Sequence, residues 1–151
     1  MFDTSKKNTL LGFCLFGSFG LAVEIFFSAF KSNYDKYALG EALDFGLTGQ
    51  SYVWMFPIYG SAFLLMDFFF PIVKQKVPQL FARIPLFILV IFFIEYLAGF
   101  VLQQLTGKCP WEYHSPYSVH GYINLAYTPF WVVFAIGLER VYEKTVVFIR
   151  R

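Results

Sequence analysis

The stretch that decides the fold of this chain is IPLFILVIFFIEYLAGFVLQQLT, residues 84–106. Its only charged side chain is Glu95, and as an α-helix it is long enough to cross the hydrocarbon core of a bilayer. Similar apolar runs lie at about 8–30, 52–73 and 119–143. The sequence therefore predicts membrane-spanning helices at these four places.

Composition supports the same class of protein, because 58% of the residues are hydrophobic and only 15% are charged. We expect an all-α integral membrane four-helix bundle, with residues 1–151 forming a single transmembrane domain. The alternating ten-residue segments of a membrane β-barrel are not visible. The run at 8–30 is too long for a signal peptide and contains Glu24, so we expect it to be retained. The net charge of +2 does not indicate nucleic acid binding.

Basic residues predict the orientation of the chain, since cytoplasmic flanks of membrane helices are enriched in lysine and arginine. One side of the four-span arrangement carries nine of them and the other side three. We therefore expect both termini in the cytoplasm, in the plasma (inner) membrane. The larger group is Lys6, Lys7, Lys74, Lys76, Arg83, Arg140, Lys144, Arg150 and Arg151; the smaller group is Lys31, Lys36 and Lys108.

On the outer side this arrangement leaves a long loop, at about 31–51, and a short one, at about 107–118. The outer loop at 31–51 mixes aromatic and acidic residues, as in a short amphipathic helix lying on the bilayer surface. At the cytoplasmic end of the last helix, the charged turn at 139–144 is expected to be solvated. Cys14 and Cys109 lie too far apart along the bundle to form a disulfide. No metal-ligand spacing or nucleotide-binding motif is present, so the sequence predicts no metal site and points to no cofactor.

The acids inside the spans carry the functional argument. At about 1.5 Å per residue, Glu24 lies roughly 9 Å and Glu95 roughly 16 Å from the outer ends of their helices, and Tyr59 roughly 10 Å from its own. A charged side chain at the centre of a membrane helix costs about 2.5–3.5 kcal/mol unless it faces the interior, binds a proton or finds a partner. The first three spans contain no lysine or arginine. The two carboxyls could share protons or a cation in one chamber, or each could be neutral and hydrogen-bonded to Tyr59, Ser28 or Tyr96.

Three further features of the spans bear on the site: a proline–glycine stretch in the second run, a glycine near Glu95, and an acid near the cytoplasmic end of the second run. Pro57 and Gly60 predict either a kinked, accessible stretch or an ordinary helix start with proline in its first turn. Gly99 lies one turn after Glu95 and permits close approach on the same face. Asp67 is expected to be structural, reaching water or Lys74.

The segment CPWEY, Cys109–Tyr113, stands where the third run leaves the membrane. Trp111 and Tyr113 are typical of the aromatic belt at a membrane interface. Because a proline directs the chain before them, the same residues with Glu112 could instead form a lid over the outer mouth of the bundle. His120 is expected at that mouth, at the start of the last helix.

These stretches together resemble the small four-helix membrane family named "putative ABC-transporter type IV", which includes transmembrane protein 229. The resemblance implies the four-helix fold, and the family name implies transport. This chain departs from the usual pattern at Val23, where the family often has tryptophan, and at Glu112, where it usually has aspartate. The resembling features are Glu24, PIYG at 57–60, Glu95 with Gly99, CPWEY at 109–113 and GYINL at 121–125.

We expect a transport-related or small-ligand-binding protein whose partners are the bilayer, further copies of itself or a larger membrane complex, and a cation, a proton or a lipid head group. The alternatives are an intramembrane enzyme acting on lipid head groups, with a glutamate as base, or a non-catalytic assembly subunit. With only two histidines in the chain the enzyme is the less favoured interpretation, and no catalytic residue is assigned. The candidate ligand-binding residues are Glu24, Tyr59, Glu95, Trp111, Glu112, Tyr113 and His120.

Overall fold

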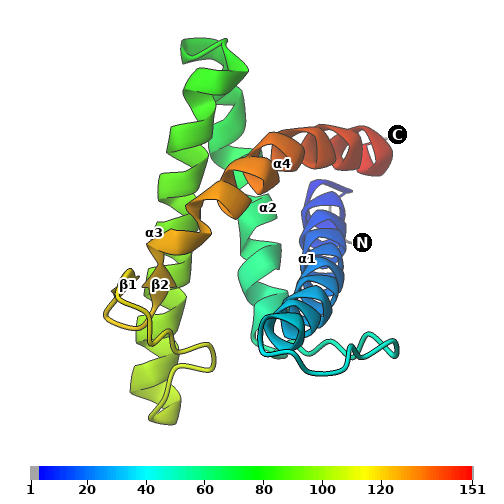
Figure 1. Ribbon diagram of the computed structural model, residues 1–151. Helices are drawn as coiled ribbons and strands as arrows, with labels where there is room; N and C mark the ends of the chain where they lie inside the picture. The colour runs from blue at the N-terminus through cyan, green and yellow to red at the C-terminus, as the bar shows by residue number, and fades with distance from the viewer. Residues whose placement is uncertain (1–3, 151) are drawn as a thin grey trace. The chain divides into compact units, whose positions relative to one another are not determined.

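The computed structural model describes residues 4–150 and is mainly helical (Figure 1). Helices α1, α2 and α3 are long and apolar enough to cross a membrane, which confirms a helical membrane protein. Helix α4 is not among these candidate spans, and charged residues occupy its second half. In chain order the elements are α1 (Thr4–Ala38), α2 (Met55–Lys76), α3 (Leu80–Thr106), β1 (Ser118–Val119), β2 (Ile123–Asn124), the 3-10 helix η1 (Leu125–Tyr127) and α4 (Thr128–Ile149).

Backbone contacts divide the chain into two compact units. Unit 1 runs to Leu65 and holds α1, the following loop and the first half of α2. Unit 2 runs from Met66 to Ile149 and holds the rest of α2 with α3, the small hairpin and α4.

In unit 1 the two helices meet through glycines. A Cβ added at Gly12 would overlap the ring of Phe63, whose side chain is fully buried, and a Cβ at Gly60 would meet the ring of Phe13 at 2.7 Å. The close approach predicted at Gly60 is therefore present. Pro57 lies in the first turn of α2, where its missing N–H breaks no helical hydrogen bond. Of the two interpretations of Pro57, the helix start is the one observed.

The loop after α1 differs from the prediction. Helix α1 continues to Ala38, and residues 39–54 contain turns but no helix, so the predicted surface helix in this loop is wrong. An ion pair of 2.7 Å between Lys31 and Asp35, one turn apart, supports the extension of α1. The side chain of Asn33 exchanges two hydrogen bonds with the backbone of Asp44, of 2.7 and 3.0 Å. These bonds hold the loop against the end of α1.

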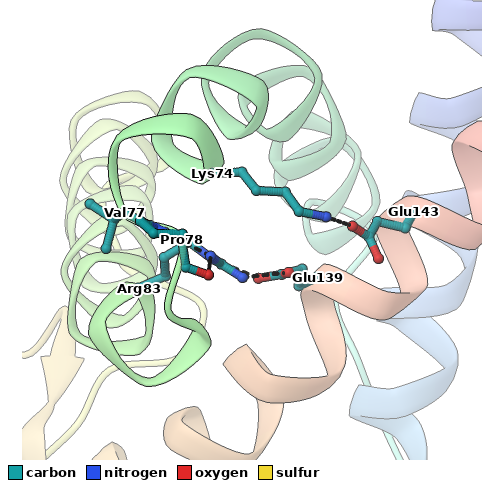
Figure 2. Close-up of polar contacts among 6 residues, drawn as sticks. All are labelled: Lys74, Val77, Pro78, Arg83, Glu139 and Glu143. Atoms are coloured by element: carbon teal, nitrogen blue, oxygen red, sulfur yellow. Dashed lines mark hydrogen bonds and ion pairs between the residues drawn. The ribbon is translucent and has the colours of Figure 1, made fainter.

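In unit 2 a buried ion pair joins α3 to α4 (Figure 2). Arg83 donates from Nε and Nη2 to the two carboxylate oxygens of Glu139, at 3.0 and 2.7 Å. Its Nη1 donates to the carbonyls of Val77 (2.7 Å) and Pro78 (2.6 Å) in the α2–α3 connection. Both charged side chains are buried. The predicted solvated helix end at 139–144 is therefore wrong for Glu139, because its charge is neutralised inside the protein.

Two more polar contacts attach the same face of α4. Lys74 pairs with Glu143 at a half-exposed position, and the Tyr142 hydroxyl donates to Asp67 at 2.8 Å. The sequence did not predict this tyrosine on α4 as a partner of Asp67, and the structural role of Asp67 stays a prediction. Glu139, Tyr142 and Glu143 are spaced i, i+3, i+4 and so lie on one side of the helix. The position of α4 within unit 2 is defined by polar side chains as well as by apolar packing.

The predicted fourth span at 119–143 begins too early, since α4 starts at Thr128. Residues 118–124 instead form an antiparallel hairpin in which Ser118 pairs with Asn124 and Val119 with Ile123. At its tip His120 and Gly121 both have positive φ, 52° and 78°, as in the tight turns that suit the twist of paired strands. The sequence analysis included these residues in the apolar run at 119–143 and did not predict the turn. The expectation of an all-α chain is therefore wrong for residues 118–124.

Candidate functional site

The acid of α3 meets the CPWEY segment in unit 2. The Tyr113 hydroxyl donates to Oε1 of Glu95 at 2.8 Å, across 18 residues of sequence. Glu95 lies well inside α3, and Thr106 is the last residue of that helix. The chain after α3 therefore folds back along the helix and brings a phenol to the carboxylate.

The hairpin tip lies against the same part of α3 (Figure 1). Nδ1 of His120 and the hydroxyl of Tyr96 are hydrogen-bonded at 2.8 Å. The Tyr122 ring packs edge-on against the Tyr96 ring, with 5.3 Å between the ring centroids. The Cβ of Tyr122 lies 3.0 Å from where a Cβ on Gly99 would stand. The close approach predicted at Gly99 is thus made by the hairpin. His120 stands on the turn of this hairpin and not at the start of a helix.

The CPWEY segment and the hairpin brace each other. The indole N–H of Trp111 donates to the carbonyl of Tyr122 at 3.1 Å, and the backbone N–H of Tyr113 donates to the carbonyl of Gly121 at 2.9 Å. The Cγ of Glu112 lies 3.3 Å from where a Cβ on Gly121 would stand. A side chain at residue 121 would therefore disturb both the positive φ and this contact.

The first residue of the segment is enclosed as well. Cys109 is buried, and burial raises the pKa of its thiol above the ordinary value for cysteine, with the nearby carboxylates of Glu112 and Glu95 adding to the effect. Both cysteines, Cys14 and Cys109, are free thiols.

Sequence reasoning missed part of this group. Tyr96 had been considered only as a hydrogen-bond partner for a carboxyl, whereas its hydroxyl is hydrogen-bonded to His120 and its ring packs against that of Tyr122. The sequence had given Tyr122 no place in the site, and its carbonyl accepts a hydrogen bond from Trp111. The ring of Tyr127 also packs near that of Tyr113, at 5.6 Å between centroids. The usable signal was the glycine after His120, since paired positive-φ residues between short apolar stretches are typical of hairpin turns.

Glu24 has its own neighbours in unit 1. The Tyr59 hydroxyl, brought by α2, hydrogen-bonds the Glu24 carboxylate, as the sequence had suggested. A Cβ on Gly20, one turn earlier in α1, would overlap the Tyr59 ring, so the glycine makes room for that ring. The hydroxyl of Ser51 lies near the same carboxylate without a hydrogen bond of normal geometry.

The predicted site residues form two groups in the structure. Five of them lie together in unit 2, and the other two lie together in unit 1. The first group is Glu95, Trp111, Glu112, Tyr113 and His120; the second is Glu24 and Tyr59. In both groups a carboxyl on a membrane helix meets a phenol, a setting that can bind a proton or a small cation. Within residues 4–150, no three side chains among His, Cys, Asp and Glu cluster as metal ligands would.

The model of a family described as "Putative ABC-transporter type IV" matches residues 11–150, which is most of the chain. This finding confirms the resemblance drawn from the sequence motifs. No solved structure matches the chain.

Proposed function

We propose that this chain, which belongs to the family described as "Putative ABC-transporter type IV", is a transport-related membrane protein that binds a small cation or a proton through carboxylates inside its helices. The observation that carries this proposal is the 2.8 Å hydrogen bond from Tyr113 to Glu95. The proposed ligand-binding residues are Glu24, Tyr59, Glu95, Trp111, Glu112, Tyr113 and His120.

The Tyr113–Glu95 contact supports binding because it joins a fixed acid to a residue on a loop. Glu95 belongs to a helix, whereas Tyr113 is held through the backbone of the hairpin. A hydroxyl that donates to a carboxylate lowers the cost of keeping it in an apolar region. A cation arriving at Glu95 would take the place of that hydroxyl. The CPWEY segment would then act as a lid that opens as the ligand enters.

The setting of the site is part of the same proposal. With α4 crossing the membrane as a fourth span and both termini in the cytoplasm of a plasma-membrane protein, the CPWEY segment would lie on the outer side. Four helices are too few to enclose a wide solute path, so we place the chain as a protomer of a homo-oligomer or a larger membrane complex. The chamber shared by Glu24 and Glu95 stays a prediction of the sequence, since each acid has a separate set of neighbours within its own unit.

A second function is favoured by one observation. Each of three acids is hydrogen-bonded to a tyrosine hydroxyl. The pairs are Asp67 with Tyr142, Glu24 with Tyr59, and Glu95 with Tyr113. A repeated acid–phenol contact could serve helix packing alone. The chain would then be a non-catalytic assembly subunit.

Thermal unfolding of the purified protein in lipid nanodiscs separates the two functions. We expect the melting temperature of the wild type to depend on pH or on added Na⁺, K⁺ or tetramethylammonium, and Glu95→Gln to reduce this dependence while keeping the fold. Glu41→Gln, which changes an exposed acid of the outer loop, is the matched control and should behave as wild type. If Glu95→Gln melts normally and its pH and cation profiles equal those of wild type, the binding function is wrong and the assembly subunit is favoured.

A further inference from the structure

Two buried polar atoms in unit 1 lack a hydrogen bond. They are Oε2 of Glu24 and Oγ of Ser51, and neither has a partner within residues 4–150. A buried polar atom without a partner loses the hydrogen bonds that it made to water, and such atoms are rare in native proteins. Because the Ser51 hydroxyl lies near the Glu24 carboxylate, the two unsatisfied atoms belong to one polar site.

The backbone before Ser51 is held in place by α1. The N–H of Gln50 donates to the hydroxyl of Ser28 at 2.7 Å, and that hydroxyl donates to the carbonyl of Ile25 at 3.0 Å. A Cβ on Gly49 would overlap the carbonyl of Ile25, the residue that follows Glu24. The loop at Gly49 and Gln50 therefore packs directly against α1 beside Glu24. Ser51 is therefore positioned by backbone packing and not by any hydrogen bond of its own hydroxyl.

The two oxygens of Glu24 have different surroundings. Since Oε2 makes no hydrogen bond, the contact with the Tyr59 hydroxyl falls on Oε1. The phenol donates to Oε1, which leaves Oε2 as the oxygen that can carry a hydrogen. Ser51 Oγ is an available acceptor for that hydrogen, because a serine hydroxyl has two lone pairs.

Charge in unit 1 does not favour an ionised Glu24. Residues 8–30 and 48–65, which cover this part of α1, the end of the loop and the start of α2, contain no lysine, arginine, histidine or other acid. The other titratable side chains in these ranges are the thiol of Cys14 and the phenols of Tyr52 and Tyr59. The next cation along α1 is Lys31, two turns away and paired with Asp35. An apolar region without a countercharge favours the neutral form of a carboxyl.

We propose that Glu24 binds a proton on Oε2 and donates it to Oγ of Ser51, so that the ligand of this carboxyl is a proton and not a metal ion. The proton is taken from water, and the carboxylate becomes a carboxylic acid with no other bond broken. One hydrogen satisfies both unpartnered atoms at once. Ca²⁺ and Mg²⁺ take about six or more oxygen ligands, so water or backbone carbonyls would have to complete a set begun by Glu24, Ser51 and Tyr59, whereas a proton needs none of these. This inference rests on the proposed binding function and specifies its ligand in unit 1.

Infrared difference spectroscopy across a pH titration tests the inference on the intact protein in nanodiscs. We expect a carbonyl band of a protonated carboxylic acid that disappears in Glu24→Gln. In Ser51→Ala the band should move to higher frequency, because the acid loses its acceptor, whereas Ser51→Thr should leave it in place. Glu41→Gln, in the exposed loop, should leave the band unchanged.

Glu24→Gln keeps the shape of a protonated glutamate and can still accept from Tyr59 and donate to Ser51, so it is expected to fold. If it does not fold, the comparison of Ser51→Ala with Ser51→Thr carries the test alone. The inference is overturned if no acid band depends on Glu24, if Ser51→Ala leaves the band in place, or if Na⁺ or K⁺ stabilises wild type but not Glu24→Gln. Failure of the Glu95→Gln experiment would affect unit 2 and leave this spectrum as it is, so the two failures are distinguishable.

Discussion

Removing Arg83 should destabilise unit 2 far more than removing Lys74, although both cations pair with glutamates one turn apart on α4. The side chains of Arg83 and Glu139 are 4% and 9% exposed, whereas those of Lys74 and Glu143 are 50% and 42% exposed. Breaking a buried ion pair from one side leaves an uncompensated charge and costs about 3–5 kcal/mol. A half-exposed pair contributes about 0–1 kcal/mol.

The structure allows the cost at Arg83 to be divided. Arg83→Met removes two bonds to Glu139 and two to the carbonyls of Val77 and Pro78. Glu139→Leu keeps the hydrogen bonds from Arg83 to these two carbonyls but leaves the buried guanidinium without a countercharge. When both changes are made, no buried charge remains and the loss is mainly that of the carbonyl bonds, about 1–2 kcal/mol. The double variant should therefore be more stable than either single variant, with a coupling of at least about 4 kcal/mol between the two changes.

Reversible unfolding by SDS in mixed micelles, followed by circular dichroism, measures these free energies. Arg83→Met and Lys74→Met are the matched pair, and the double variant Arg83→Met with Glu139→Leu completes the cycle. Equal losses of stability in Arg83→Met and Lys74→Met would refute the assignment of Arg83 as a buried, neutralised cation. So would strictly additive effects of the two changes at Arg83 and Glu139.

Two further predictions concern a glycine and a thiol. Gly49→Ala should lower the free energy of unfolding or prevent folding, because the new Cβ would overlap the carbonyl oxygen of Ile25. Gly137→Ala should raise the free energy of unfolding by up to about 1 kcal/mol, because Gly137 lies inside α4 with no atom close to its Cβ position. Unfolding in SDS measures both variants, and equal effects would contradict the contact between Gly49 and Ile25. In a Cys14→Ser background, the raised pKa of Cys109 should make alkylation slow near neutral pH and faster only at higher pH than for an ordinary thiol. Mass spectrometry follows the reaction, with the SDS-unfolded protein as the fast control, and a native rate equal to that control would be contrary to burial of Cys109.

The candidate site was predictable in its membership and not in its contacts. Glu24 and Glu95 are conspicuous because a carboxyl in an apolar run is expensive wherever it points, and this cost can be read without a fold. The partner of Glu95 was not foreseen, since Tyr113 is brought to it by the fold of the chain after α3. Ser51 was overlooked because a serine beside a helix start has no distinguishing pattern.

Length and apolarity by themselves determined the helices that can span a membrane, because a helix satisfies its backbone hydrogen bonds locally and the bilayer requires about 20 apolar residues. Only the tertiary structure decided where α4 begins, that His120 stands on a hairpin, and that Glu139 is buried. Arg83 and Glu139 are 56 residues apart, and neither residue's immediate sequence distinguishes a solvated charge from a paired one. Their pairing depends on which surfaces meet, and that is a property of the folded chain as a whole.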